Sequence, residues 1–128
     1  MITKVLLRAG QKFDIYIIKN GDISEVSNFI ESLQSPESNS EFNKVSQRLD
    51  AFRNHGPSKD EHKFRHEGNE IYAVKTKNVR LYGFFDGKQC FVLAVGFLKN
   101  KHGGRKVERR YCTKAEELRK ALHESMED

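Results

Sequence analysis

One segment constrains the fold more than any other. The nine residues from Cys90 to Leu98, CFVLAVGFL, carry no charged side chain. The run is far shorter than the roughly 20 apolar residues that a membrane helix needs. A short apolar run bounded by turn-forming residues is typical of a β-strand covered on both faces. We therefore expect a central strand here, inside a globular domain.

The sequence around this run also has strand character. Short groups of turn-forming residues divide it: Gly68-Asn69, Thr76-Lys77-Asn78 and Asp86-Gly87. An Asp-Gly pair between two apolar runs is a strong β-hairpin signal. Late strands that pair antiparallel are predicted over 64–65, 70–75, 79–85 and 90–98. An earlier strand is predicted over 12–19, and residues 2–7 form either a preceding strand or a loose arm.

Apolar residues at helical spacing predict three helices, over 23–33, 42–52 and 115–122. Capping boxes place the start of the first at Asp22 and of the third at Thr113. Gly56-Pro57 ends the second helix. The first two helices form a helical hairpin joined by a polar loop. The order β, α, α, β-meander, α predicts an α+β fold, and a length of 128 residues predicts a single domain over 1–128.

Positive charge is concentrated in one half of the chain. From His62 to Tyr111 there are 12 Lys or Arg residues and 4 Asp or Glu, whereas the rest of the chain has 11 and 14. The basic half is also the half that predicts the late strands, and it holds His62, His66 and His102. A sheet with this excess of cations favours a polyanionic ligand, and nucleic acid is the commonest one.

Several classes of protein do not fit the sequence. It has no Cys-x-x-Cys pair, no phosphate-binding glycine loop and no Gly-x-Ser-x-Gly, so we expect neither a metal nor a cofactor. Two cysteines are too few for a disulfide scaffold, which favours a reducing compartment. The amino-terminal residues lack the apolar core of a signal peptide. A cytoplasmic protein without a membrane segment is the expectation.

The residue types in the basic half suffice for RNA cleavage without a metal. In that reaction the RNA 2′-hydroxyl attacks the adjacent phosphate, which needs a base, an acid and cations. His66, His102 and Tyr111 are candidates for the proton transfers. Arg80 interrupts the apolar strand VRLYGFF, which favours a functional role. Lys75 is a further catalytic candidate, and the phosphate-binding candidates are Lys63, Arg65, Lys77, Lys99, Lys101, Arg109 and Arg110. The same set also suffices for phosphate binding without cleavage.

The order of these segments resembles the RelE/HigB superfamily of toxins from type II toxin–antitoxin modules, in particular its phage-derived HigB-like branch. The resemblance runs from Phe13 to Leu122 and is carried by FDIYIIK with EVSNFIESL, IYAVK, VRLYGFF, VLAVGFLKNK and LRKA. It implies a RelE-like, curved, antiparallel-dominated sheet with helices packed on one side. It also implies a metal-free endoribonuclease that cuts mRNA, commonly in the ribosomal A site.

By this resemblance, Lys75 and Arg80 hold phosphate or stabilise the transition state, and Lys99 and Lys101 add cations. The sequence departs from the family pattern at Asn100, which separates the two lysines. The segment 101–112 is also longer than usual, and we expect it to form an extra hairpin around Gly103-Gly104.

The leading hypothesis is an mRNA interferase that inhibits translation at the ribosome and is neutralised by a cognate antitoxin. Operator DNA would be bound only through the antitoxin complex. A ParE-like toxin that poisons gyrase is an alternative, although that branch lacks the proton-transfer residues. A nucleic-acid-binding module without catalysis is a third possibility, because the basic sheet alone does not separate binding from cleavage.

Overall fold

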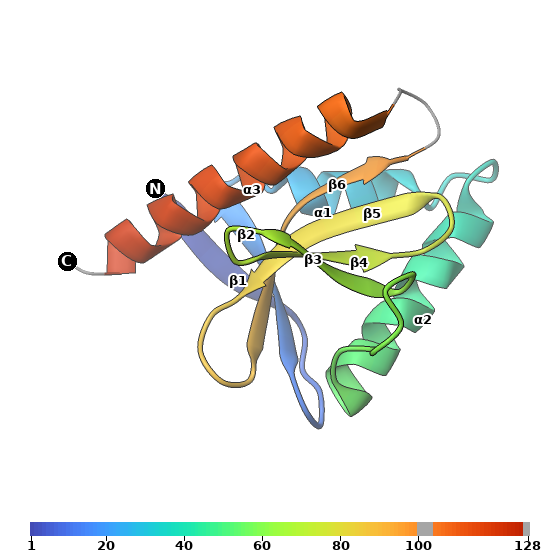
Figure 1. The fold of residues 1–128 in the computed structure, drawn as a ribbon, viewed down its shortest axis with the longest axis horizontal. Helices are drawn as coiled ribbons and strands as arrows, with labels where there is room; N and C mark the ends of the chain where they lie inside the picture. The colour runs from blue at the N-terminus through green and yellow to red at the C-terminus, as the bar shows by residue number, and fades with distance from the viewer. Residues whose placement is uncertain (100–103, 127–128) are drawn as a thin grey trace.

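The fold is an α+β sandwich built on one six-stranded sheet, in a computed structural model that describes residues 1–99 and 104–126 (Figure 1). The elements in chain order are β1 (Ile2–Arg8), β2 (Asp14–Asn20), α1 (Glu25–Ser32), α2 (Asn39–His55), β3 (Phe64–Gly68), β4 (Ile71–Lys75), β5 (Val79–Phe85), β6 (Cys90–Leu98) and α3 (Gly104–Met126). The predicted fold class is thus observed, and residues 2–7 belong to a strand rather than to a loose arm.

The sheet has the order β1-β2-β6-β5-β4-β3. Four of its neighbouring pairs are antiparallel, and β2 pairs parallel with β6, with Tyr16 opposite Val92. Strand β2 was expected in the sheet. It runs parallel to β6, whereas the strands were predicted to pair antiparallel. Parallel neighbours need a long connection between them, and here the whole segment from α1 to β5 supplies it.

Strand β6 lies inside the sheet and is covered on both faces, as its apolar sequence predicted. Leu93 belongs to the core between the sheet and the helices α1 and α2, whereas Val92 belongs to the core beneath α3. Figure 1 shows α3 crossing one face while α1 and α2 lie on the other. The expectation that helices pack on one side only is therefore wrong. A strand that is apolar on both faces needs a cover on each.

The N-cap of the first helix lies two residues after the predicted one. Ser24 is the N-cap, and its Oγ accepts a hydrogen bond from the backbone N–H of Ser27 at 3.2 Å. Asp22 lies instead in the turn that follows β2, where Asn20 and Ile23 exchange backbone hydrogen bonds. Helix α2 follows α1 directly in the chain, and both helices contribute to the same core.

Helix α3 begins at Gly104, nine residues before the predicted start at Thr113. Residues 104–112 are helical and form no hairpin; positions 101–103 lie outside the described residues. The early turns are held to the sheet by Tyr111, whose ring stacks on Phe97 with centroids 4.3 Å apart. The extension brings Arg105, Glu108 and Arg109 of α3 to one hollow with Arg65 and Tyr82 of the sheet.

Candidate functional site

Four strand ends meet at one end of the sheet and form an open cleft. They are the start of β3, the end of β4, the start of β5 and the end of β6, and α2 adds one further side chain. The cleft has a volume of about 650 Å³. We call it the basic cleft, and its lining residues are Arg48, Asp60, Glu61, His62, Lys63, Arg65, Lys75, Thr76, Lys77, Arg80 and Lys99. Seven of these are Lys or Arg and two are acidic, so the cleft carries a strong positive charge.

The centre of the basic cleft is a pair of cations that face each other across two strands. Lys75 at the end of β4 lies directly opposite Arg80 near the start of β5. Like charges in opposite positions of a sheet destabilise it. An anion that binds between or above Lys75 and Arg80 would therefore reduce their repulsion and stabilise the fold.

Arg80 is fixed in place by the turn that joins β4 to β5. It is buried, with 7% of its surface exposed, and its Nη1 donates to the backbone oxygens of Thr76 at 2.5 Å and Val79 at 3.0 Å. Burial lowers the pKa of Arg80, but a guanidinium remains charged at any physiological pH. Arg80 is therefore an immobilised positive charge at the floor of the cleft.

Lys75 is held less tightly and is electrostatically strained. Its Nζ donates to the backbone oxygen of Glu61 at 3.1 Å. Burial lowers the pKa of Lys75, the charge of Arg80 lowers it further, and Glu67 offsets part of the shift. An anionic ligand would relieve this strain, because a negative charge nearby favours the protonated ammonium.

The cations of the basic cleft largely lack carboxylate partners. Among residues 1–99 and 104–126, Arg65 alone of the seven lies within 4 Å of a carboxylate, at 3.9 Å from Glu67. By contrast, Lys4, Arg8, Arg53, Lys114, Arg119 and Lys120 all form ion pairs elsewhere on the molecule. The charge of the cleft is therefore left for a ligand, and an anion with several charges matches it best.

The structure brings together six of the predicted phosphate-binding residues. They are Lys63, Arg65, Lys75, Lys77, Arg80 and Lys99. Two of the predicted residues, Arg109 and Arg110, lie on α3: Arg109 lines a second hollow beside the cleft, and Arg110 lies on the outer side of the helix with Lys106 and Lys114. Lys101 and His102 are outside the described residues.

The predicted proton-transfer residues are not gathered in the cleft. His66 lies on β3 with its ring 4.8 Å from the ring of Tyr72, which packs in the core on the α1–α2 side. Successive residues of a strand point to opposite faces, so His66 faces away from its neighbour Arg65. Tyr111 is half-buried against Phe97 and does not line the cleft.

Sequence reasoning missed three residues near this site, and one of them is His62, which precedes β3 and lines the cleft. Arg48 comes from α2, and its Nε donates to the backbone oxygen of Lys75 at 3.0 Å. Nothing in the sequence links a polar position of a helix to a strand 27 residues later. Glu67 is half-buried in the second hollow, and burial raises its pKa although the nearby charges of Arg65 and Lys75 lower it. Its burial depends on α3, whose start was misplaced.

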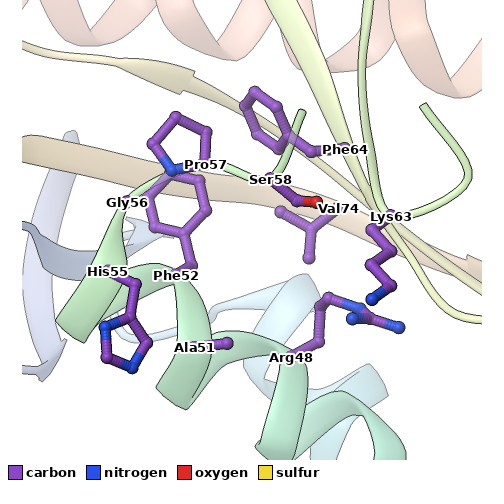
Figure 2. A pocket seen from close by; sticks show the side chains of 10 residues that line it. All are labelled: Arg48, Ala51, Phe52, His55, Gly56, Pro57, Ser58, Lys63, Phe64 and Val74. Carbon is purple, nitrogen blue, oxygen red and sulfur yellow. The ribbon is translucent and has the colours of Figure 1, made fainter. Parts of the chain in front are cut away.

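A smaller apolar hollow of about 260 Å³ adjoins the basic cleft between α2 and the sheet. Figure 2 shows the rings of Phe52, Phe64 and Pro57 on one side of it and the charged ends of Arg48 and Lys63 on another. Arg48 and Lys63 also line the basic cleft. An uncharged part of a ligand can thus be held beside its anionic part.

Neither a metal-ligand cluster nor a known relative assigns a function to this site. Among the described residues, no three His, Cys, Asp or Glu side chains are grouped to hold a metal ion. In the same part of the chain, no helix has the length and apolar character to span a membrane. No protein-family model matches the sequence, and no curated protein shows significant similarity to it.

Proposed function

We propose that this protein binds RNA in the basic cleft and cleaves its backbone without a metal ion, as a translation-inhibiting toxin of the RelE/HigB type. One observation carries the proposal: seven Lys or Arg side chains line one cleft, and within the described residues only Arg65 has a carboxylate within 4 Å. An RNA backbone supplies the row of phosphates that such a cleft can neutralise.

The reaction has a defined balance. The 2′-oxygen of the RNA forms a bond to the adjacent phosphorus while the bond to the 5′-oxygen breaks, which leaves a 2′,3′-cyclic phosphate and a 5′-hydroxyl. A base takes the proton of the 2′-hydroxyl and an acid supplies one to the 5′-oxygen. The negative charge on the phosphorane oxygens increases during this step, so cations fixed in advance lower its barrier.

The residues of the cleft fit these roles unequally. Arg80 is anchored by two backbone oxygens and is suited to hold the phosphorane charge without reorganising. Lys75 and His62 are the cleft residues suited to exchange a proton, and the pKa of Lys75 is shifted by burial and by Arg80 in the direction that eases its release. Lys63 and Lys99 are exposed and suited to guide the flanking phosphates.

The family resemblance is compatible with this arrangement. Lys75, Arg80 and Lys99, to which the resemblance assigns phosphate, all line the same cleft. The α+β architecture with a mostly antiparallel sheet fits a RelE-like fold, although α3 covers a second face. By the same resemblance the RNA would be mRNA on the ribosome in the cytoplasm. A cognate antitoxin with an acidic segment would neutralise the cleft.

A second function, RNA binding without cleavage, is favoured by one specific observation. Neither His66 nor Tyr111 lines the cleft, so two of the three predicted proton-transfer residues are not positioned for the reaction. In this case the same cations would hold the RNA backbone and the chain would act as a binding module.

The experiment is induced expression in bacteria, with growth followed and primer extension carried out on abundant mRNAs. We expect arrest with discrete new 5′ ends inside reading frames. Both should be lost in Lys75→Gln and in Arg80→Lys, which keeps the charge but not the planar fork of donors. Thermal melting of each purified variant shows whether it is folded. Arrest without cleavage would indicate the gyrase-directed alternative, and RNA binding without arrest or cleavage would indicate the binding module.

A further inference from the structure

We infer that the second hollow, which is lined by Glu67 and Arg109, is a nucleobase pocket that selects guanine. Glu67 is the residue that recognises the base. The inference rests on the proposed RNA-binding function and names the sequence preference of that same site. We call this hollow the base pocket. Its lining residues are Arg65, Glu67, Asn69, Tyr82, Arg105, Glu108, Arg109, Cys112, Thr113 and Glu116.

The base pocket has the size of a ligand site and joins the basic cleft. Its volume is about 600 Å³, within the roughly 300–1,000 Å³ of typical ligand pockets. Arg65 lines both hollows. The strand register places Arg65 beside Ala73 and Ala73 beside Tyr82, and two pairs further along it places Lys75 beside Arg80. The base pocket and the cation pair therefore share one face of the sheet.

The charges of the base pocket differ from those of the cleft. Its three guanidinium groups are matched by three carboxylates, from Glu67, Glu108 and Glu116. Glu116 already accepts from Asn69 at 3.1 Å and pairs with Lys120 at 3.2 Å. Carboxylates repel phosphate, so this hollow is unsuited to continue the backbone path. They accept hydrogen bonds from the N–H groups of a base.

Glu67 is the best placed of the three carboxylates. It lies at the irregularity of the β3–β4 pairing, where the register shifts between His66 and Gly68. Its side chain is 22% exposed, and its one described ion-pair partner is Arg65 at the long distance of 3.9 Å. Burial raises the pKa of Glu67. A hydrogen-bond donor from a ligand would compensate the desolvation that this carboxylate undergoes.

The floor of the pocket carries an aromatic side chain with a polar tip. Tyr82 lies there with only 2% of its surface exposed. Among the described residues, its hydroxyl is not one of the buried side-chain atoms that lack a hydrogen-bond partner, so it is open to the pocket. A base that enters the pocket brings polar atoms to this hydroxyl.

The pattern of donors and acceptors selects guanine. On its Watson–Crick edge guanine presents a ring N–H next to an amino group, and a carboxylate accepts from both at once. Adenine and cytosine lack the ring N–H, and uracil lacks the amino group. On the opposite edge, guanine O6 and N7 accept from an arginine such as Arg65 or Arg109. One carboxylate and one guanidinium therefore match two edges of the same base.

The test is fluorescence anisotropy with short single-stranded RNAs that are 2′-O-methylated, so that no strand can be cleaved. Four oligonucleotides differ at one central base: guanine, inosine, adenine or uracil in a uracil background. The base of inosine is guanine without its amino group. We expect wild type to bind the guanine strand about tenfold or more tighter than the inosine strand, the loss expected for one hydrogen bond to a charged group.

Glu67→Gln separates base reading from general electrostatics. Removing a negative charge should tighten the binding of all four strands, while the ratio between guanine and inosine should fall below about threefold. A merely electrostatic role would tighten binding and leave that ratio unchanged. The matched control is Glu70→Gln, which removes the same charge from a side chain that is 75% exposed and outside both hollows. It should leave the ratio as in wild type.

Each outcome has one meaning. Equal binding of the four strands by wild type would overturn the guanine inference and leave RNA binding in place. A guanine preference that persists in Glu67→Gln would overturn the assignment of Glu67 as the reading residue. Failure of wild type to bind any strand would overturn the proposed function itself, together with this inference.

Discussion

The two ends of the sheet hold their cations in opposite ways. At the end formed by the β1–β2 and β5–β6 connections, Lys4 pairs with Asp86 at 2.6 Å, and Arg8 and Arg53 both pair with Asp50 at 2.8 Å. We call this the paired end. At the other end, the seven cations of the basic cleft have a single described carboxylate contact, at 3.9 Å.

Lys4 and Lys75 show what this difference means for a single residue type. Burial lowers the pKa of both lysines. For Lys4 the hydrogen bond to Asp86 and the nearby negative charges outweigh burial, so its pKa is raised. For Lys75 the neighbouring Arg80 adds to the effect of burial, so its pKa is lowered. A partner carboxylate, rather than burial, separates a lysine that holds the fold together from one that is available to a ligand.

The largest expected effect comes from removing charge at the basic cleft. The triple change Lys63→Gln, Lys75→Gln and Lys99→Gln should weaken binding of single-stranded RNA about 100-fold, because three charge-assisted contacts of about 1 kcal/mol each are lost. The control changes three exposed lysines outside the cleft, Lys12, Lys44 and Lys88, to Gln. Anisotropy titrations of the two triple variants compare equal changes in net charge. Equal losses of affinity would show that the cleft has no special role.

Salt dependence sharpens the comparison. Neutralising about four phosphates gives a slope of log K against log salt near −3 for a single strand. The cleft triple variant should reduce the size of that slope by about 2, and the control triple variant should leave it nearly unchanged. Titrations at several salt concentrations measure both slopes. A slope that is unaffected by the cleft changes would place the phosphates elsewhere on the surface.

A single lysine at each end should affect stability differently. Lys4→Gln removes the partner of Asp86 and should lower the free energy of unfolding by about 1 kcal/mol. Lys99→Gln removes an exposed positive charge near Lys75, and should change the free energy of unfolding by less than about 0.5 kcal/mol. At low salt this change should be an increase, because repulsion between the two lysines is removed. Urea denaturation measures both variants. A loss from Lys99→Gln as large as that from Lys4→Gln would contradict the distinction between the ends.

The smallest expected effect is a pH dependence of opposite sign at the two lysines. A raised folded pKa, as for Lys4, gives stability that is present below the ordinary lysine pKa and is lost as pH rises through the folded value. A lowered folded pKa, as for Lys75, means that the folded chain binds fewer protons, so stability increases as pH rises toward the unfolded value. Denaturation of Lys4→Gln and Lys75→Gln across alkaline pH should therefore diverge from wild type in opposite directions. Parallel curves would show that the two lysines do not differ in this way.

Local sequence patterns were enough to predict much of the fold. The apolar run from Cys90 to Leu98 predicted the covered strand β6, and the Asp86-Gly87 pair predicted the β5–β6 hairpin. The parallel pairing of β2 with β6 was not predictable, because no local signal joins Tyr16 to Val92. The start of α3 was missed because Gly103-Gly104 reads as a turn and the cations from Arg105 to Arg110 conceal the helical face.

The candidate site was predictable in its charge but not in its assembly. The concentration of cations in one half of the chain indicated Lys75 and Arg80. The alternation of side chains along a strand could have separated Arg65 from His66, since neighbouring residues cannot share a face. Arg48 and Glu67 depend on where α2 and α3 pack, and tertiary packing of that kind leaves no trace in a single sequence.

The parallel pairing of β2 with β6 also sets an order of events during synthesis. The β1–β2 hairpin leaves the ribosome first but must wait for β6, which is made when most of the chain already exists. Contacts this far apart in sequence close slowly, because the long loop between them must first lose its freedom. Of the four strand ends that form the basic cleft, those of β3, β4 and β5 are made before β6 and belong to strands that pair with one another. A nascent chain that stops before Cys90 therefore contains every lining residue of the basic cleft except Lys99, but lacks the central strand beside which β5 lies.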